Sequence, residues 1–129
     1  MTNNFYNNFF NVVKNFPKKV ALEFHGISVT YLELDNSVRC LENNLIKLGL
    51  RKGDRIIVSI QKSLEYIYLY LSCLKSGVIF IPINPEYSDS EFNYFIHDCN
   101  PKIIVFDEQT IRQITHNKIL IAELYQDKK

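Results

Sequence analysis

Hydrophobic residues recur at helical spacing in one long stretch of the chain, residues 34–48. Its apolar positions are Leu34, Val38, Leu41, Leu45 and Leu48. Side chains three and four residues apart share one face of a helix, so this stretch predicts an amphipathic helix. Thr30 and Glu33 fit a capping box at its start, and Gly49 fits a left-handed residue at its end. The pattern therefore predicts a helix with defined limits.

Three short runs are almost wholly apolar: residues 55–60, 78–83 and 102–106. Such runs are typical of strands that are covered on both faces, as in parallel sheets. Ser63 fits the start of a helix between the first two runs, and Gly77 fits its end. A second capping box predicts another helix between the last two runs; its residues are Ser88 and Glu91, and Asn100-Pro101 ends the helix.

The remaining segments complete an alternating pattern. Residues 20–30 predict a small hairpin that turns at His25-Gly26, and they follow an opening segment rich in Asn and Phe. A weak helix near residues 109–114 and a strand near residues 118–122 are expected at the other end. Alternating strands and helices with short loops predict an α/β fold with a mostly parallel sheet and helices on both faces.

The composition suits one domain of ordinary globular character. The chain has 129 residues, of which 47% are hydrophobic and 22% charged, and its formal net charge is +1. A near-neutral chain is not expected to have nucleic acid as its main partner, because phosphate binding needs clustered basic residues. The most apolar region, residues 64–83, contains Glu65, Lys75 and Pro82, so we expect no membrane span.

Cysteine and histidine positions bear on compartment and metal binding. Cys40, Cys73 and Cys99 form no C-x-x-C pair, which indicates reduced, mostly buried thiols. With no recognisable signal peptide, the expected location is the cytoplasm. The three histidines lie outside any cluster with metal-ligand spacing, so no metal site is expected.

Candidate chemistry is sparse. The four glycines stand singly, and neither G-x-G-x-x-G nor G-x-x-x-x-G-K-[ST] is present. Gly49 and Gly53 better fit a turn between helix and strand than a phosphate cradle. Asp107 is interpreted as part of a solvated loop rather than as a phospho-acceptor, and Tyr66 and Tyr70 as packing residues. The sequence assigns no catalytic, cofactor-binding or metal-binding residue.

Three segments together resemble the adenylate-forming superfamily, which contains acyl-CoA synthetases, adenylation domains of nonribosomal peptide synthetases and luciferases. Residues 29–34 resemble its first core motif, residues 48–55 the turn that follows, and residues 74–87 its second core motif. The resemblance implies mainly structural roles for the matching residues. These are Thr30, Tyr31, Glu33, Leu34, Gly49, Gly53, Asp54, Lys75, Gly77, Pro82, Asn84, Pro85 and Tyr87.

The resemblance also implies a fold and a reaction. Residues 1–129 would form part of the large N-terminal domain of an AMP-dependent ligase, before its phosphate-binding loop. The full-length family uses ATP, Mg²⁺ and coenzyme A: a carboxylate attacks the α-phosphate of ATP, and coenzyme A then displaces AMP. No residue here matches the family's phosphate loop, ribose-binding acid, hinge or C-terminal lysine, so no cofactor is expected for this chain alone.

Several hypotheses about function stay open. The leading one is a truncated N-terminal segment of an AMP-forming acyl-CoA ligase that is inactive alone, for which the ending Asp127-Lys128-Lys129 would fit a frameshift. Asn84 favours acyl-CoA synthetases, and residues 62–65 and 94–98 look most like malonyl-CoA synthetases. The alternatives are half of a split ligase completed by a downstream-encoded polypeptide, a fragment of an amino-acid adenylation domain, and a non-enzymatic α/β interaction domain.

Overall fold

The computed structural model describes residues 4–125, and the terminal Asp127-Lys128-Lys129 lies outside them. Five helices and six strands follow one another along this part of the chain. They are α1 (Asn4–Asn15), β1 (Val20–Phe24), β2 (Ile27–Thr30), α2 (Tyr31–Lys47), β3 (Arg55–Ser59), α3 (Leu64–Ser76), β4 (Ile79–Pro82), α4 (Asp89–Cys99), β5 (Ile103–Phe106), β6 (Lys118–Leu120) and α5 (Ile121–Tyr125).

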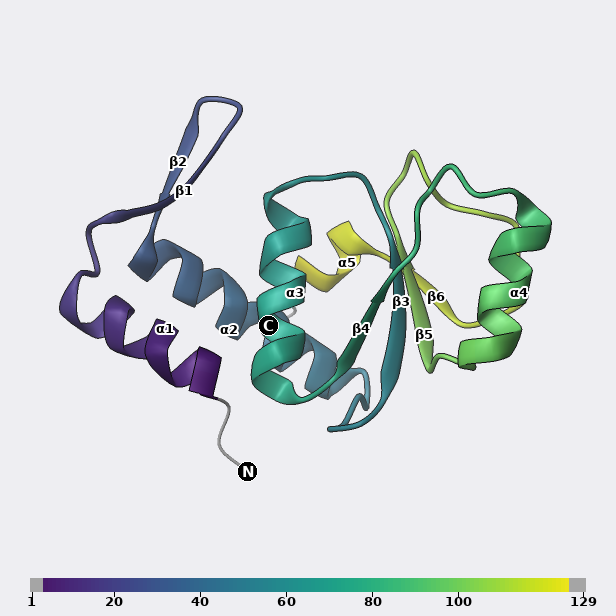
Figure 1. Ribbon diagram of the computed structural model, residues 1–129, viewed down its shortest axis with the longest axis horizontal. Helices are drawn as coiled ribbons and strands as arrows, with labels where there is room; N and C mark the ends of the chain where they lie inside the picture. The colour runs from purple at the N-terminus through teal and green to yellow at the C-terminus, as the bar shows by residue number, and fades with distance from the viewer. Residues whose placement is uncertain (1–3, 126–129) are drawn as a thin grey trace.

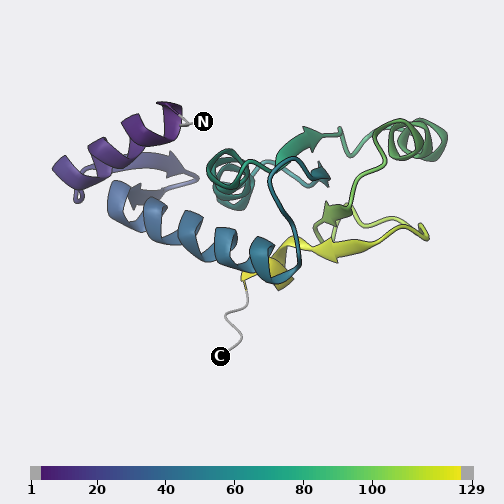
Figure 2. The same ribbon diagram turned by 90° about the horizontal axis from the view of Figure 1, so that it is seen from below.

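Four strands form a parallel sheet in the order β4-β3-β5-β6. Ile57 in the middle of β3 lies opposite Ile81 of β4 and Ile104 of β5. Helices α3 and α5 lie on one side of the sheet and α4 lies on the other (Figure 1). Turning the molecule shows α4 and α1 at opposite ends (Figure 2). The α/β fold with a parallel sheet, predicted from the alternating pattern, is confirmed.

The core lies on both faces of the sheet because successive side chains of a strand point to opposite sides. Ile56 and Val58 of β3 pack with the helical Leu41 and Leu69 on one face. On the other face, Ile57 joins a cluster under α4 that includes Phe92, Phe106 and Ile104. Burial on both faces explains why the strand sequences are nearly continuous apolar runs.

Local hydrogen bonds set the predicted helix starts. At α2, the Glu33 N–H donates to Thr30 Oγ1 at 3.2 Å, and the Thr30 N–H donates to Glu33 Oε1 at 2.9 Å. Ser88 and Glu91 form the same reciprocal pair at the start of α4. Gly77 ends α3 with φ +78°, a left-handed conformation that glycine adopts without strain. Both capping boxes and the end of α3 are confirmed.

The hairpin of β1 and β2 stands apart from the main sheet (Figure 1). Its turn residues His25 and Gly26 have φ values of +49° and +81°, which a tight turn between antiparallel strands requires. The predicted hairpin is therefore confirmed, and its tip lies where the sequence places it. Backbone bonding anchors its base, since the Tyr31 N–H donates to Lys19 O at 2.9 Å.

The structure adds a helix at the start of the chain, where the sequence predicted no element, and corrects the predictions at the other end. The opening segment is the helix α1, which buries Tyr6 and Val13. Residues 109–114 form a turn followed by coil, so the helix predicted there is wrong. The strand predicted at 118–122 ends at Leu120, because the chain enters α5 at Ile121.

Two expectations about individual side chains are met only in part. Leu48 is 43% exposed, so the buried stripe of α2 ends at Leu45. Cys73 is buried as predicted, whereas Cys40 and Cys99 are only partly buried. Among residues 4–125, no helix combines the length and the apolar character that a bilayer crossing requires.

Candidate functional site

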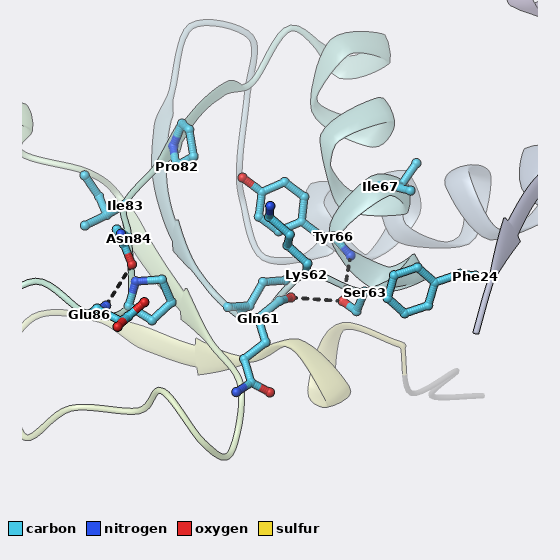
Figure 3. A pocket seen from close by; sticks show the side chains of 12 residues that line it. Phe24, Gln61, Lys62, Ser63, Tyr66, Ile67, Pro82, Ile83, Asn84 and Glu86 are labelled. Atoms are coloured by element: carbon cyan, nitrogen blue, oxygen red, sulfur yellow. Dashed lines mark hydrogen bonds between the residues drawn. The ribbon is translucent and has the colours of Figure 1, made fainter.

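An open cavity of about 1060 Å³ lies at the carboxyl ends of β3 and β4 (Figure 3). This is the edge of a parallel sheet where ligands usually bind. Three segments line it: the chain from β3 into α3, the loop after β4, and the tip of the hairpin. The lining residues are Ile60, Gln61, Lys62, Ser63, Tyr66, Ile67, Pro82, Ile83, Asn84, Pro85, Glu86 and Phe24.

One wall is the entry into α3. The Tyr66 N–H donates to Ser63 Oγ at 3.2 Å, and that hydroxyl donates to Gln61 O at 3.2 Å. The Ser63 side chain is therefore committed to the helix start. The Tyr66 ring meets the Phe80 ring edge-on at 5.4 Å, and burial raises the pKa of the Tyr66 hydroxyl. This wall contributes both apolar and polar side chains to the cavity lining.

The opposite wall is the loop after β4, which belongs to the second core motif. The Glu86 N–H donates to Asn84 Oδ1 at 2.9 Å, and the Tyr87 N–H donates to Asn84 O at 3.1 Å. Asn84 thus forms an Asx turn, which fixes the loop locally. Pro82 sits in the edge strand β4, where its missing N–H costs no ladder hydrogen bond. These motif residues shape the cavity.

Hydrogen bonds to Asp107 join the loops that follow β3 and β5. Its Oδ2 accepts the Gln61 N–H at 2.7 Å, and its Oδ1 accepts the N–H groups of Gln109 and Thr110, both at 2.9 Å. The Thr110 hydroxyl in turn donates to Ser59 O at 2.6 Å. Asp107 therefore lies in a hydrogen-bonded loop, rather than the merely solvated loop that the sequence suggests.

The turn between Gly49 and Gly53 lies at the other end of the sheet. Both glycines have left-handed φ values, +88° and +89°. Asp54 Oδ2 accepts the Arg51 N–H at 2.7 Å and pairs with Lys102 Nζ at 3.2 Å. The hydrogen bond from the Arg51 N–H, more than the Lys102 charge, lowers the pKa of the Asp54 carboxyl. The predicted helix-to-strand turn is confirmed.

No glycine follows β3, β4 or β5 at the cavity end of the sheet. Gly26 lies in the hairpin, Gly49 and Gly53 precede β3, and Gly77 precedes β4. A phosphate cradle needs converging backbone N–H groups in a loop that comes close to the anion, and glycine usually supplies them. Within the part of the chain that the structure describes, no three His, Cys, Asp or Glu side chains gather where they could hold a metal ion.

Comparison with protein-family models assigns the chain. The model described as AMP-binding enzyme matches residues 9–128. The chain belongs to the AMP-binding enzyme family. The predicted resemblance to adenylate-forming enzymes is thereby confirmed at the level of the family.

Two curated proteins illustrate the sequence similarity. A medium-chain fatty-acid–CoA ligase of Escherichia coli K12 is 34% identical over 88 residues, which cover 67% of this chain and 16% of that protein. Surfactin synthase subunit 1 of Bacillus subtilis is 32% identical over 91 residues, or 70% of this chain and 2% of that protein. The chain thus spans a small fraction of these relatives.

Solved structures show the same fold. The N-terminal subdomain of NpsA from Klebsiella oxytoca, in complex with 3-hydroxybenzoyl-AMSN, superposes with a TM-score of 0.85 at 23% identity, covering 94% of this chain and 31% of that one. An O-succinylbenzoate coenzyme A synthetase of Bacillus subtilis in complex with AMP gives 0.85 at 21% identity, covering 93% and 32%. Both place this chain's fold in the N-terminal domain of adenylate-forming enzymes.

One motif residue, Lys75, has a role that only the structure reveals. Lys75 Nζ pairs with Glu42 at 2.9 Å and lies 5.2 Å from the Tyr6 ring centroid, so it joins α3 to α2 and α1. Sequence reasoning missed Arg112, whose guanidinium holds the loop after β4. No sequence motif marks Arg112, because its partners lie 23 to 27 residues away.

Proposed function

We propose that this chain forms the first α/β unit of an AMP-forming acyl-CoA ligase and does not activate a carboxylate by itself. The observation that carries this proposal is the family match over residues 9–128 in a chain whose loops after β3, β4 and β5 contain no glycine. Family membership supports the reaction class. The glycine-free loops support the proposal that this unit has no phosphate-binding loop for a nucleotide.

The polar groups around the cavity support the same assignment of roles. Mg²⁺ is held by free carboxylate oxygens and by the phosphates of a bound nucleotide. Both carboxylate oxygens of Asp107 already accept backbone N–H groups, and the Ser63 hydroxyl is committed to the start of α3. We assign ATP, Mg²⁺ and coenzyme A to the rest of the ligase, because the cavity lining contains no glycine and a single carboxylate, Glu86. This unit supplies one side of the scaffold.

One candidate source for the rest of the ligase is a polypeptide encoded downstream, as in a split enzyme. The segment that aligns with the E. coli medium-chain ligase covers 16% of that protein, so most of such an enzyme lies outside the matched segment. A complete catalytic machinery requires the larger remainder. In this arrangement the chain is one part of a split enzyme, located in the cytoplasm and acting in fatty-acid metabolism.

Within the family, we place the chain with the acyl-CoA ligases and choose malonate as the first acid to assay. Asn84 supports the acyl-CoA branch, and the malonyl-CoA synthetase resemblance rests on residues 62–65 and 94–98. Similarity to surfactin synthase favours a second candidate, the first part of an amino-acid adenylation domain. Parallel assays with fatty acids and amino acids discriminate the two.

Reconstitution tests the proposal. The chain is co-expressed with the polypeptide encoded downstream, and carboxylate-dependent release of pyrophosphate is measured with ATP, Mg²⁺ and each acid. We expect release from the pair and none from either polypeptide alone. Pyrophosphate release by this chain alone would contradict the proposal. A monodisperse chain that forms no complex with the second polypeptide would instead favour a non-enzymatic interaction domain.

A further inference from the structure

Arg112 reaches from the coil before β6 to the loop that forms one wall of the cavity. Its Nη2 donates to Pro85 O at 2.9 Å and to Tyr87 O at 2.6 Å. Its Nη1 pairs with Asp89 Oδ1 at 2.7 Å, at the first residue of α4. One side chain therefore binds both the loop after β4 and the start of the following helix.

The surroundings of the Arg112 guanidinium hold it in place. Its central carbon lies 4.4 Å from the centroid of the Phe92 ring, and the Arg112 side chain is only 12% exposed. Phe92 is itself buried and stacks on Phe106 of the sheet with ring centroids 5.7 Å apart. A cation over an aromatic face gains strength when water is excluded, so this stacking orients the guanidinium.

The backbone of Arg112 is also fixed. Lys118 Nζ donates to Arg112 O at 3.1 Å and to Ile114 O at 3.4 Å. Lys118 begins β6, so these bonds tie the coil to the sheet. A continuous set of contacts thus runs from the edge of the sheet through Arg112 to the cavity loop.

We propose that Arg112 is the positioning residue for residues 84–87 and fixes this wall of the cavity. The planar fork of a guanidinium can bond several oxygens at once, whereas a lysine ammonium acts as a point charge without that geometry. This inference goes beyond the function proposed above and does not depend on it, because it concerns the shape of the loop and not what binds beside it.

The alternative is that Arg112 makes only a surface ion pair with Asp89. The Asp89 side chain is 88% exposed, and ion pairs with such a partner contribute little. The two backbone carbonyls distinguish the explanations, since they remain as acceptors when Asp89 is neutralised. Asp89→Asn is therefore a matched control for Arg112→Ala.

Hydrogen exchange of the full chain tests the proposal, with the amides of Glu86 and Tyr87 as reporters. We expect their exchange to accelerate about tenfold or more in Arg112→Ala, since each bond from a charged donor is lost, and less than about twofold in Asp89→Asn. Amides of Ile57 and Ile104 in the sheet serve as references and should keep their wild-type rates. Unchanged rates at Glu86 and Tyr87 in Arg112→Ala would overturn the proposal.

Arg112→Lys provides a second and milder test. It keeps a positive charge near Phe92 but loses the planar guanidinium, so the exchange rates of the Glu86 and Tyr87 amides should lie between those of wild type and Arg112→Ala. The Tyr87 ring stacks on Phe95 at 5.6 Å, and its ring-proton NMR shifts should move toward free values in the same order. Full rescue of both signals by lysine would show that charge alone suffices, and a uniform rise at the reference amides as well would show a general stability role; either result overturns the proposal.

Discussion

The attachment of α1 offers a quantitative test of the buried polar contacts. The Tyr6 hydroxyl donates to Asp35 Oδ1 at 3.0 Å, and Asp35 is only 2% exposed. Tyr6→Phe removes this donor and keeps the ring. A hydrogen bond to a buried charged acceptor contributes about 1.5–3 kcal/mol, so we expect the free energy of unfolding to fall by about that amount. Arg39 Nε, 2.9 Å from Asp35 Oδ2, still pairs with the carboxylate and prevents a larger loss.

Urea denaturation followed by circular dichroism measures the loss. Tyr94→Phe is the matched control, because Tyr94 is 64% exposed on α4 and its change should stay within about 0.5 kcal/mol. A double-mutant cycle with Asp35→Asn isolates the pair, and its coupling energy should account for most of the Tyr6 effect. Equal stabilities for Tyr6→Phe and Tyr94→Phe would refute the reasoning from burial.

Three further measurements address helix capping, thiol chemistry and pH. Thr30→Ala should lower the free energy of unfolding by about 1 kcal/mol, because it leaves helix-end N–H groups unpaired; Thr30→Ser should restore most of it, and a neutral Thr30→Ala would contradict the capping role. Burial raises the pKa of the Cys73 thiol to about 12, so iodoacetamide at pH 8 should modify Cys40 and Cys99 first, as peptide mass spectrometry can check; equal rates would argue against this burial. Burial and the Asp35 hydrogen bond raise the pKa of Tyr6 above its ordinary value of 10.0, so the folded state holds this proton more tightly. The contribution of Tyr6 to the free energy of unfolding is therefore fully present below about pH 10 and is lost as the pH rises above it. In denaturation experiments at pH 9–11, Tyr6→Phe should flatten the resulting decline in stability. An unchanged slope would count against the raised pKa.

Features that depend on neighbouring residues could be predicted from the sequence. The turn at His25-Gly26 and the capping boxes at Thr30 and Ser88 each form within four residues, so spacing alone determines them. The apolar strands could be predicted equally well, because strands buried on both faces are continuous apolar runs and do not alternate with polar residues. These local signals were sufficient for the fold class.

Features that depend on distant contacts could not be predicted. Helix α1 is rich in asparagine, a weak helix former, and it gains its stability by packing Tyr6 and Val13 inward. Residues 109–114 have a helical pattern, but Asp107 closes a single turn and Arg112 turns away to the cavity loop. Tertiary bonds overrode the local preference there.

In the candidate site, too, local features could be predicted and features that depend on distant contacts could not. The motif at residues 74–87 located the loop beside the cavity, and the glycine positions indicated a turn at residues 49–53. Only the structure shows the hydrogen bonds by which Asp107 joins two loops and the position of Arg112, since their partners lie up to 46 residues away. A single sequence carries no signal for such pairs.

Isothermal titration of the isolated chain with ATP and Mg²⁺ tests the central claim most directly. The loops at the carboxyl ends of β3, β4 and β5 offer no glycine cradle for a triphosphate, so we predict no saturable heat up to millimolar nucleotide. Saturable binding of ATP with a micromolar dissociation constant would contradict the account.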